Sequence, residues 1–303
     1  MGWAHDMCAM VFAIRNEGCS MTKLSFDDLK GKVCVITGGA GLIGKSLSEG
    51  LASVGVRIVI LDLEKDSTNA FAAELSRKFG VRTLGLQANV LDRQSLAKAK
   101  LTINRELGKI SFLINCAGGN SPKATTQSEY VEKEVHGNLQ KTFYGLDLEG
   151  FRQVFDLNFL GTILPTMVFT TDMIELGSGA VLNISSMNAF RPLTKIPAYS
   201  AAKASINNFT EWLAVHLAKV NIRVNAIAPG FLLTNQNRFL LTSQKTGNLN
   251  SRGKKILSCT PMGKFGSSED LIGATLFLLS DLSSFITGVV LPIDGGFNAY
   301  SGV

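Results

Sequence analysis

Tyr199 and Lys203 stand four residues apart in the stretch PAYSAAKASINNF, and side chains at that spacing lie on one helix face. A phenol beside an ammonium group can exchange a proton with a substrate oxygen. A phenol titrates near pH 10, so use near pH 7 requires a drop of about 3 units, or about 4 kcal/mol. One cation at about 4 Å supplies about 4 kcal/mol at an effective dielectric constant of 20. The pair is a catalytic candidate, although the spacing alone also fits a surface aromatic beside a lysine.

A glycine-rich turn in VCVITGGAGLIGKSLSEG separates a strand-like apolar run from a helical pattern. Gly38, Gly41 and Gly44 would permit the tight turn, the approach of backbone amides to a pyrophosphate, and close packing of helix on strand. Asp62 ends the next apolar run, RIVILD, where a carboxylate can accept hydrogen bonds from an adenosine ribose. Because that carboxylate would repel a 2′-phosphate, the sequence favours NAD(H) over NADP(H).

Short apolar runs alternate with helical patterns from residue 32 onward: KVCVITGG, RIVILD, TLGLQAN, SFLINCAGG, GAVLNISS, IRVNAIAPG and GVVLPIDGG. This alternation predicts an α/β fold with a single Rossmann-type, doubly wound, parallel seven-stranded sheet and helices on both faces. We expect a single NAD-binding catalytic domain over residues 21–303. Two long segments, at about 119–150 and 231–268, are the expected substrate loops, because α/β proteins bind ligands beyond the carboxyl ends of their strands.

Further motifs follow the predicted strands: NCAGG at 115–119, DLNFLGT at 156–162, NISSMNAF at 183–190, APGFLLT at 228–234 and DGG at 294–296. With the glycine-rich turn and the Tyr–Lys pair, this ordered set resembles the short-chain dehydrogenase/reductase superfamily from about Leu24 to the end of the chain. The resemblance implies an NAD-dependent enzyme that acts on a CH–OH group. The catalytic set that it implies is Asn158, Ser186, Tyr199 and Lys203. The cofactor-binding set is Gly38, Gly41, Leu42, Ile43, Gly44, Asp62, Asn89, Val90, Asn115, Ala117, Gly118, Tyr199, Lys203, Pro229, Gly230 and Thr234.

Two departures from the superfamily pattern are visible. The turn reads TGxxGxxG, with Leu42 where most short members have glycine, and this spacing resembles the extended nucleotide-sugar epimerases. Asn89 followed by Val90 replaces the usual Asp-Val that contacts adenine, although an amide can also hydrogen-bond the adenine edge.

The substrate is narrowed by a second resemblance. CAGGNSPKATT, NISSMNAFRPLTKIPAYSAAKA, IAPGFLLTNQNR and DGGFNAYSGV are similar to segments of the D-mannonate oxidoreductase (fructuronate reductase) group of the superfamily. This similarity implies NAD-linked interconversion of D-mannonate and D-fructuronate. Polar side chains just past strand ends could bind such a sugar acid: Asn120, Lys123, Asn188, Arg191, Gln236, Asn237 and Arg238. Arg191 is the leading candidate for holding the substrate carboxylate.

Other functions remain open at this point. Another hexonate or polyol dehydrogenase, such as a gluconate 5-dehydrogenase, shares the catalytic residues and differs in the substrate loops. A nucleotide-sugar epimerase carries a larger C-terminal substrate domain than this chain offers. A catalytically silent NAD-sensing scaffold would have lost the Tyr or the Lys, and this chain has both.

Composition sets limits on partners. The net charge is +6, but the basic residues are scattered, and no apolar run reaches the roughly 18 residues of a membrane span, so we expect neither nucleic acid nor membrane as a partner. Five isolated cysteines suit a reducing cytoplasm, and the three histidines show no metal-ligand spacing. Glu132 and His136 could pair on a metal, but a solvated helix face explains them better. We therefore expect no metal.

Two expectations concern the ends and the assembly. Residues 1–20 lack the features of a signal peptide and precede an ordinary-looking start at Met21, so we expect a dispensable extension. The segment FTEWLAVHLAK is more apolar than one sheet-facing side requires. By family resemblance this helix packs on a symmetry mate, which implies a homotetramer or a homodimer.

Overall fold

Parallel strands form the centre of the protein. The computed structural model describes residues 24–132, 139–233, 241 and 248–302. All strands pair in parallel, in the order β3-β2-β1-β4-β5-β6-β7. The predicted seven-stranded parallel sheet is confirmed. Its strands are β1 (Val33–Thr37), β2 (Arg57–Asp62), β3 (Thr83–Gln87), β4 (Phe112–Asn115), β5 (Gly179–Ile184), β6 (Ile222–Pro229) and β7 (Val290–Ile293).

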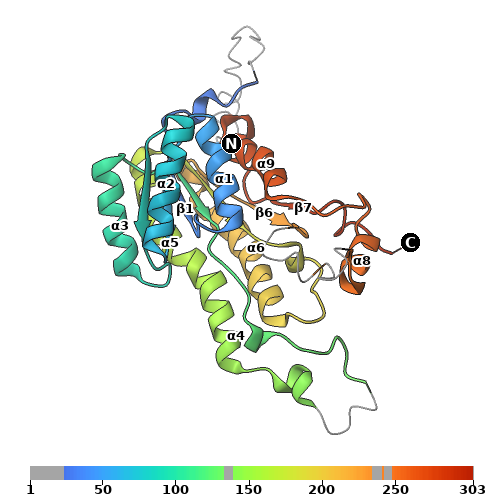
Figure 1. Ribbon diagram of the computed structural model, residues 1–303. Coiled ribbons are helices and arrows are strands. Elements are labelled where there is room, and N and C mark those ends of the chain that lie inside the picture. The colour runs from blue at the N-terminus through green and yellow to red at the C-terminus, as the bar shows by residue number, and fades with distance from the viewer. Residues whose placement is uncertain (1–23, 133–138, 234–240, 242–247, 303) are drawn as a thin grey trace, which may run out of the picture.

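Helices cover both faces of this sheet, as Figure 1 shows. One face packs against α1 (Leu42–Ser53), α2 (Lys65–Phe79) and α9 (Ile272–Leu279). The other face packs against helices α3 (Arg93–Glu106), α5 (Gly161–Leu176) and α6 (Pro197–Leu217). Strand β1 contributes to both cores, because successive side chains point to opposite faces of a strand. Both layers therefore need apolar strand residues, which explains the nearly continuous apolar runs in the sequence.

The order of the strands locates the crevice in which ligands bind. Strand β1 pairs with β2 on one side and with β4 on the other, so the chain winds outward in both directions from this point. In doubly wound sheets the crevice lies outside the carboxyl ends of the strands at such a switch point. Thr37 and Asn115, which end β1 and β4, are paired at this place.

The first of the two expected substrate segments forms an arm beyond the sheet. After β4 the chain runs out to α4 (Leu148–Phe155), and α4 joins α5 through the short helical turn η6 (Asp156–Leu160). Figure 1 shows this continuous helix extending past the sheet, with the preceding segment looping beyond it. The stretch Leu148–Leu176 is long and apolar enough to match a membrane span, but 50% of its most apolar window is buried inside the protein. Phe169 and Met173 of α5 are fully buried against the sheet, as in a core helix.

The second expected substrate segment also contains regular structure, since α8 (Ser251–Ser258) lies within residues 231–268. Asn250 begins this helix, and its side chain accepts a hydrogen bond from the Gly253 amide at 2.9 Å.

Residues 1–20 and His136 lie outside the described residues. Among those that are described, no three His, Cys, Asp or Glu side chains gather as metal ligands.

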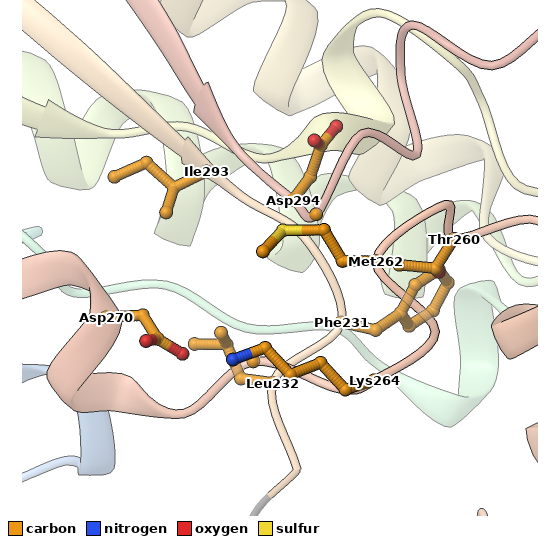
Figure 2. A pocket seen from close by; sticks show the side chains of 10 residues that line it. Phe231, Leu232, Thr260, Met262, Lys264, Asp270, Ile293 and Asp294 are labelled. Carbon is orange, nitrogen blue, oxygen red and sulfur yellow. The ribbon is translucent and has the colours of Figure 1, made fainter.

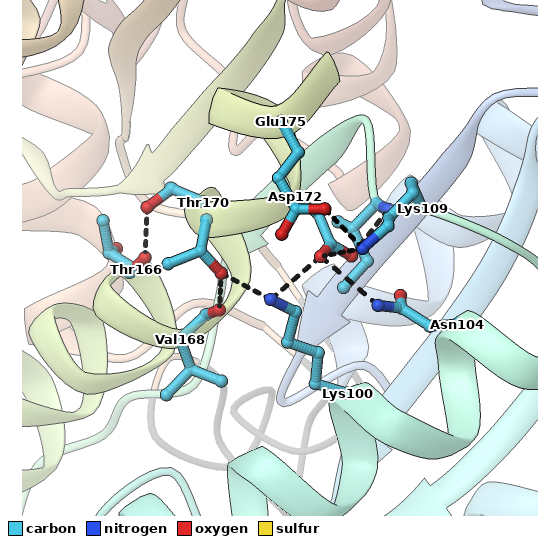
Figure 3. Close-up of polar contacts among 10 residues, drawn as sticks. Lys100, Asn104, Lys109, Thr166, Val168, Thr170, Asp172 and Glu175 are labelled. Atoms are coloured by element: carbon cyan, nitrogen blue, oxygen red, sulfur yellow. Dashed lines mark hydrogen bonds and ion pairs between the residues drawn. The ribbon is translucent and has the colours of Figure 1, made fainter. Parts of the chain in front are cut away.

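A buried carboxylate ties helix α5 to the neighbouring elements (Figure 3). Asp172 is fully buried and lies 2.8 Å from Lys100 Nζ of α3, and it accepts a hydrogen bond from the Ile110 amide at 3.1 Å. Lys109 and Asn104 reach the same carboxylate. Burial alone would raise the pKa of Asp172, but these partners outweigh burial and hold the pKa below its ordinary value. The carboxylate is therefore charged and part of the framework.

Candidate active site

The glycine-rich turn connects β1 to α1 at the edge of the crevice. Gly38 has a φ of +62°, and a Cβ atom there would lie 2.8 Å from the Ala117 Cα. A Cβ atom on Gly44 would lie 2.5 Å from the Gly38 carbonyl oxygen. Neither position accepts a side chain, so the turn passes close to β4 on one side and α1 on the other. Helix α1 begins after Gly41, and no side chain caps it. Its free amides and helix dipole suit an anion such as a pyrophosphate, in line with the predicted places of Leu42 and Ile43.

Asp62 lies beside this turn at the end of β2. Its Oδ2 accepts a hydrogen bond from the Ala40 amide at 3.0 Å, and its Oδ1 accepts one from the Leu63 amide at 2.8 Å. These bonds fix the carboxylate next to the turn, and a carboxylate has further lone pairs for hydroxyl donors. The position fits the predicted contact with a ribose.

The residues predicted to border adenine lie after β3. Asn89 Oδ1 accepts a hydrogen bond from the Leu91 amide at 2.9 Å, so the NH₂ group is the part of this side chain that can donate to a ligand. Val90 is buried, and a Cβ atom on Gly161 would lie 3.0 Å from its Cγ2. Val90 therefore packs β3 against the start of α5.

The segment after β4 is held by a residue that the sequence analysis did not select. The Thr37 hydroxyl accepts hydrogen bonds from the Cys116 and Ala117 amides at 3.1 and 3.2 Å. Thr37 is the last residue of β1, directly before the glycine-rich turn, and that position is the only signal that the sequence offers for it. The Asn115 side chain points into the core, because its Nδ2 donates to Thr166 Oγ1 and Asn183 Oδ1, both at 2.9 Å. Asn115 thus contributes to the crevice through its backbone.

Tyr199 and Lys203 lie near the start of α6, where Pro197 occupies the first turn. Lys203 Nζ lies 5.6 Å from the centre of the Tyr199 ring. Lys203 is 4% exposed, and its ammonium group donates a hydrogen bond to the Ile184 carbonyl oxygen at 2.7 Å. Ser186 follows β5 and is buried, and its hydroxyl accepts a hydrogen bond from the Asn188 amide at 3.3 Å. The carboxyl end of β5 thus lies against the face of α6 that carries Tyr199 and Lys203.

Asn158 reaches the same place from the other side of the crevice. It lies in η6, which has π-helical geometry, a feature common at functional sites. Its Nδ2 donates to the Gly119 carbonyl oxygen at 2.7 Å, and its Oδ1 accepts from the Gly119 amide at 3.2 Å. A Cβ atom on Gly118 would lie 2.7 Å from Asn158 Oδ1 and 3.3 Å from Lys203 Nζ. Asn158 and Lys203 therefore approach one backbone position after β4, and the four predicted catalytic residues converge.

Burial has the largest effect on the pKa of Tyr199 in this structure. Burial raises the pKa of Tyr199, and the Ser186 side chain acts in the lowering direction. The Lys203 ammonium group, 5.6 Å from the centre of the Tyr199 ring, donates its hydrogen bond to the Ile184 carbonyl oxygen. Burial lowers the pKa of Lys203 to about 8. The predicted lowering of the Tyr199 pKa relied on Lys203 together with the positive charge of an oxidised nicotinamide, and it stays a prediction.

Four of the predicted substrate residues, Asn120, Lys123, Asn188 and Arg191, lie in the part of the chain that the structure describes. Arg191 Nε donates to the Asn298 carbonyl oxygen at 3.3 Å, and Asn120 Nδ2 donates to Thr125 Oγ1 at 2.9 Å. Lys123 is exposed and passes next to Gly150 of α4. Asn188 is buried, and its Oδ1 has no hydrogen-bond partner in the part of the chain that the structure describes. The other three, Gln236, Asn237 and Arg238, lie outside the described residues, as does Thr234 of the predicted cofactor-binding set.

Pro229 and Gly230 end β6 beside β7. The Gly230 amide donates to the Ile293 carbonyl oxygen at 2.9 Å, and a Cβ atom on Gly230 would lie 2.6 Å from the Asp294 Cα. The DGG motif therefore packs directly against the Pro-Gly turn. A pocket of about 250 Å³ lies at this junction, and Figure 2 shows the Lys264 side chain extending toward Asp270 on its wall.

A second pocket, of about 450 Å³, is called the basic pocket here. Its walls come from the arm, from the segment before α6 and from α8. Its charged residues are Glu129, Lys195, Arg252 and Lys255. None of them was among the predicted substrate residues, although Glu129, Arg252 and Lys255 lie in the two expected substrate loops and Lys195 lies in the segment that contains Tyr199. Ile196, three residues before Tyr199, and Phe231, directly after Gly230, also line it, so the basic pocket lies next to the start of α6 and to the Pro-Gly turn.

Comparisons with known proteins agree with this geometry. The family model described as enoyl-(acyl carrier protein) reductase, a short-chain dehydrogenase/reductase model, matches residues 39–298. An uncharacterized oxidoreductase from Haemophilus influenzae is 48% identical, over 91% of this chain and 96% of that protein. The uncharacterized oxidoreductase UxuB from Bacillus subtilis is 46% identical, over 91% of this chain and 98% of that protein.

A solved structure adds a bound ligand to the comparison. It is described as a candidate D-mannonate oxidoreductase from Haemophilus influenza with bound NAD. It superposes with a TM-score of 0.87 at 47% identity, covering 92% of this chain and 99% of that one. The convergent Asn, Ser, Tyr and Lys, the glycine-rich turn and these matches lead to one assignment: the chain belongs to the short-chain dehydrogenase/reductase family of oxidoreductases.

Proposed function

We propose that this protein is an NAD-dependent oxidoreductase that interconverts a secondary alcohol and a ketone on a sugar acid, with D-mannonate and D-fructuronate as the pair. The observation that carries the proposal is the convergence of Tyr199, Ser186, Lys203 and Asn158 beside a basic pocket. The description of the similar Haemophilus influenza structure, which has NAD bound, supports the choice of substrate and cofactor.

The residues at the crevice fit a dinucleotide. The Gly38 and Gly44 positions exclude side chains, the α1 amides face the crevice uncapped, and the Asp62 carboxylate stands beside them. Gly41, Leu42 and Ile43 would hold the pyrophosphate through backbone amides, and Asp62 would hold the ribose diol. We propose a preference for NAD(H) because Asp62 would repel a 2′-phosphate. When bound, the nicotinamide takes up or gives the hydride, and its oxidised ring adds a positive charge to the site.

Tyr199 is the proposed general acid/base. Its phenol would take the proton of the substrate hydroxyl during oxidation and return it during reduction, while the Ser186 hydroxyl holds the reacting oxygen by a hydrogen bond. The raised pKa of Tyr199 keeps the phenol protonated near neutral pH, the form that donates a proton to a ketone. Oxidation then requires a further positive charge to lower that pKa.

Lys203 and Asn158 complete the proposed proton path. With a pKa of about 8, Lys203 can gain or lose a proton close to neutral pH. Asn158 Oδ1 lies near the same backbone position as Lys203 Nζ and is held there by Gly119. An amide at this place can orient a water molecule between the ammonium group and solvent.

Assembly and location are also proposed. Trp212 and Val215 of α6 and Met167 of α5 are 57%, 79% and 55% exposed, and the Trp212 ring stacks on His216. An apolar helix face of this kind suits a second copy of the chain, so we propose a homodimer or homotetramer. A cytoplasmic location fits the separate free thiols of Cys34, Cys116 and Cys259.

The test is steady-state kinetics, in which NADH formation is followed against a panel of hexonates, hexuronates and neutral hexitols. We expect D-mannonate with NAD to give the highest kcat/KM of the panel. A neutral hexitol that exceeds every acid would overturn the assignment to sugar acids. A higher value for D-gluconate would move the substrate to a gluconate 5-dehydrogenase type and leave the sugar-acid class intact.

A further inference from the structure

We infer that the substrate carboxylate is held in the basic pocket by Arg252, with Lys195 as the second cation. This inference rests on the proposed function, because it assumes a sugar acid as substrate. It replaces Arg191 as the leading candidate for the carboxylate and assigns specificity to helix α8.

The basic pocket lies where the far end of a hexonate would extend. Ile196 precedes α6, and Tyr199 lies about 4.5 Å farther along the helix axis, given a rise of 1.5 Å per residue. Phe231 on the opposite wall directly follows the Pro-Gly turn of β6. The arm closes a third side, since the Thr126 amide donates to the Lys195 carbonyl oxygen at 2.9 Å. A carbon chain with its reacting hydroxyl at Tyr199 and Ser186 can therefore direct its carboxylate into this pocket.

The walls of the basic pocket carry more positive than negative charge. Among the described residues that line it, Lys195, Arg252 and Lys255 stand with a single carboxylate, that of Glu129. Lys255 Nζ lies 2.8 Å from Glu129 Oε2, so these two largely neutralise each other. Lys195 donates to the Gln127 carbonyl oxygen at 2.7 Å, which positions the ammonium group without neutralising it. The pocket is left with the charges of Lys195 and Arg252, which suits one anionic ligand group.

Arg252 is the stronger of the two remaining cations. It lies three residues before Lys255, so both side chains lie on the same face of α8. Its guanidinium is close enough to Glu129 to help hold the pKa of that carboxyl below the ordinary value, after the larger effects of Lys255 and Lys195. A guanidinium can also bind a carboxylate through two parallel hydrogen bonds, which an ammonium group cannot.

Arg191 and Lys123, which the sequence analysis proposed for substrate binding, are less suitable than Arg252 for holding the carboxylate. Arg191 Nε is directed to the Asn298 carbonyl oxygen, and Arg191 does not line the basic pocket. Lys123 is exposed at the base of α4 and does not line it either. Neither Arg191 nor Lys123 therefore lines the cavity next to Ile196.

The decisive experiment compares D-mannonate with its neutral primary amide, which has nearly the same shape and no charge. In the parent enzyme we expect the acid to be strongly preferred in kcat/KM. Arg252→Gln should lower kcat/KM for the acid about tenfold to a hundredfold, mostly through KM, and leave the amide nearly unchanged. Lys195→Gln should give a smaller loss of the same kind. Glu129→Gln should raise kcat/KM for the acid about twofold to threefold, since it removes a repelling charge.

Lys254→Gln is the matched control, because Lys254 is an exposed cation on the same helix that does not line the pocket. It should leave both substrates unchanged. Melting temperatures and NADH binding of each variant verify that the fold is intact. Arg252→Lys should recover part of the loss if charge is what matters.

The outcomes separate the inference from the proposed function. If the parent enzyme oxidises no hexonate, the proposed function is wrong. If it oxidises D-mannonate but Arg252→Gln behaves like Lys254→Gln, or loses acid and amide equally, the function stands and the role of Arg252 is overturned. A selective loss of the acid in Arg191→Gln instead would restore Arg191 as the carboxylate-binding residue.

Discussion

The cofactor edge, formed by residues 37–44, Asp62 and residues 115–118, differs in construction from the basic pocket. At the cofactor edge the backbone is the main element, because the turn excludes side chains and Thr37 and Asp62 hold amides in place. The basic pocket consists of side chains from the arm, the segment before α6 and α8, which are far apart in the sequence. A site made of backbone constrains residue types strictly, whereas a site made of side chains can change its chemistry without changing the fold.

Tyr199 is the proposed acid/base, and Tyr199→Phe is the variant with the largest expected effect. The ring still packs, but the proton donor is lost, so turnover should fall by about two to four orders of magnitude. NADH affinity, measured by fluorescence titration, should stay near the parent value because the cofactor edge is untouched. Activity within tenfold of the parent would remove Tyr199 from its role as the acid/base.

The next largest effect is expected on the stability of the protein, at the buried carboxylate of Asp172. Asp172→Asn should destabilise the protein by about 3 to 5 kcal/mol, because it leaves the largely buried ammonium group of Lys100 without its charge partner. The lowered pKa of Asp172 means that this stabilisation is present above about pH 4, the unfolded value, and is lost as pH falls through the folded value.

Urea unfolding at several pH values checks this prediction. The stability difference between parent and Asp172→Asn should be large at neutral pH and shrink in acid. A constant difference, or one smaller than about 1 kcal/mol, would mean that solvent screens the cluster more than its burial indicates.

Asp62 tests whether the cofactor edge alone sets cofactor choice. Asp62→Ala should weaken kcat/KM with NAD about tenfold to a hundredfold and improve the relative use of NADP, since both a hydrogen-bond acceptor and a repelling charge are removed. Parallel kinetics with the two cofactors measure the ratio. Comparable kcat/KM for NAD and NADP in the parent enzyme would contradict the role given to Asp62.

The smallest effect is expected at Arg191. Its contact with the Asn298 carbonyl oxygen is a single exposed hydrogen bond, worth about 0.5 to 1.5 kcal/mol. Arg191→Ala should therefore change kcat/KM for D-mannonate by threefold or less and leave its preference over the amide unchanged. Acid-specific loss above tenfold would show that the substrate carboxylate lies nearer the end of β5 than α8.

The sequence predicted the strands and the cofactor edge in detail because their signals are local. Apolar runs of strand length, the spacing of Gly38, Gly41 and Gly44, and the Tyr199–Lys203 pair can each be recognised within a short window. The fold was predicted correctly, and the four catalytic candidates do converge.

The charged wall of the basic pocket could not be predicted in this way. Lys195 and Arg252 meet only because the arm, the segment before α6 and α8 pack around one cavity, and nothing in their own neighbourhoods signals that meeting. The direction of the Lys203 side chain also depends on a distant partner, the carbonyl oxygen of Ile184. Sequence spacing placed Lys203 near Tyr199 but did not show what its charge would contact.

The π-helical turn at Asp156–Leu160 has a consequence for how this chain can change over evolutionary time. A π turn holds one residue more than the α-helical turn that could replace it. Deleting one residue here would let α4 and α5 join as a regular helix, and the two flanking helices would keep nearly the same phase, because the wider π turn takes up the extra residue. The residues within the turn would shift, so Asn158 would lose its place beside Gly119. Single-residue deletions in this segment should therefore preserve the core and the arm but remove Asn158 from the other catalytic candidates.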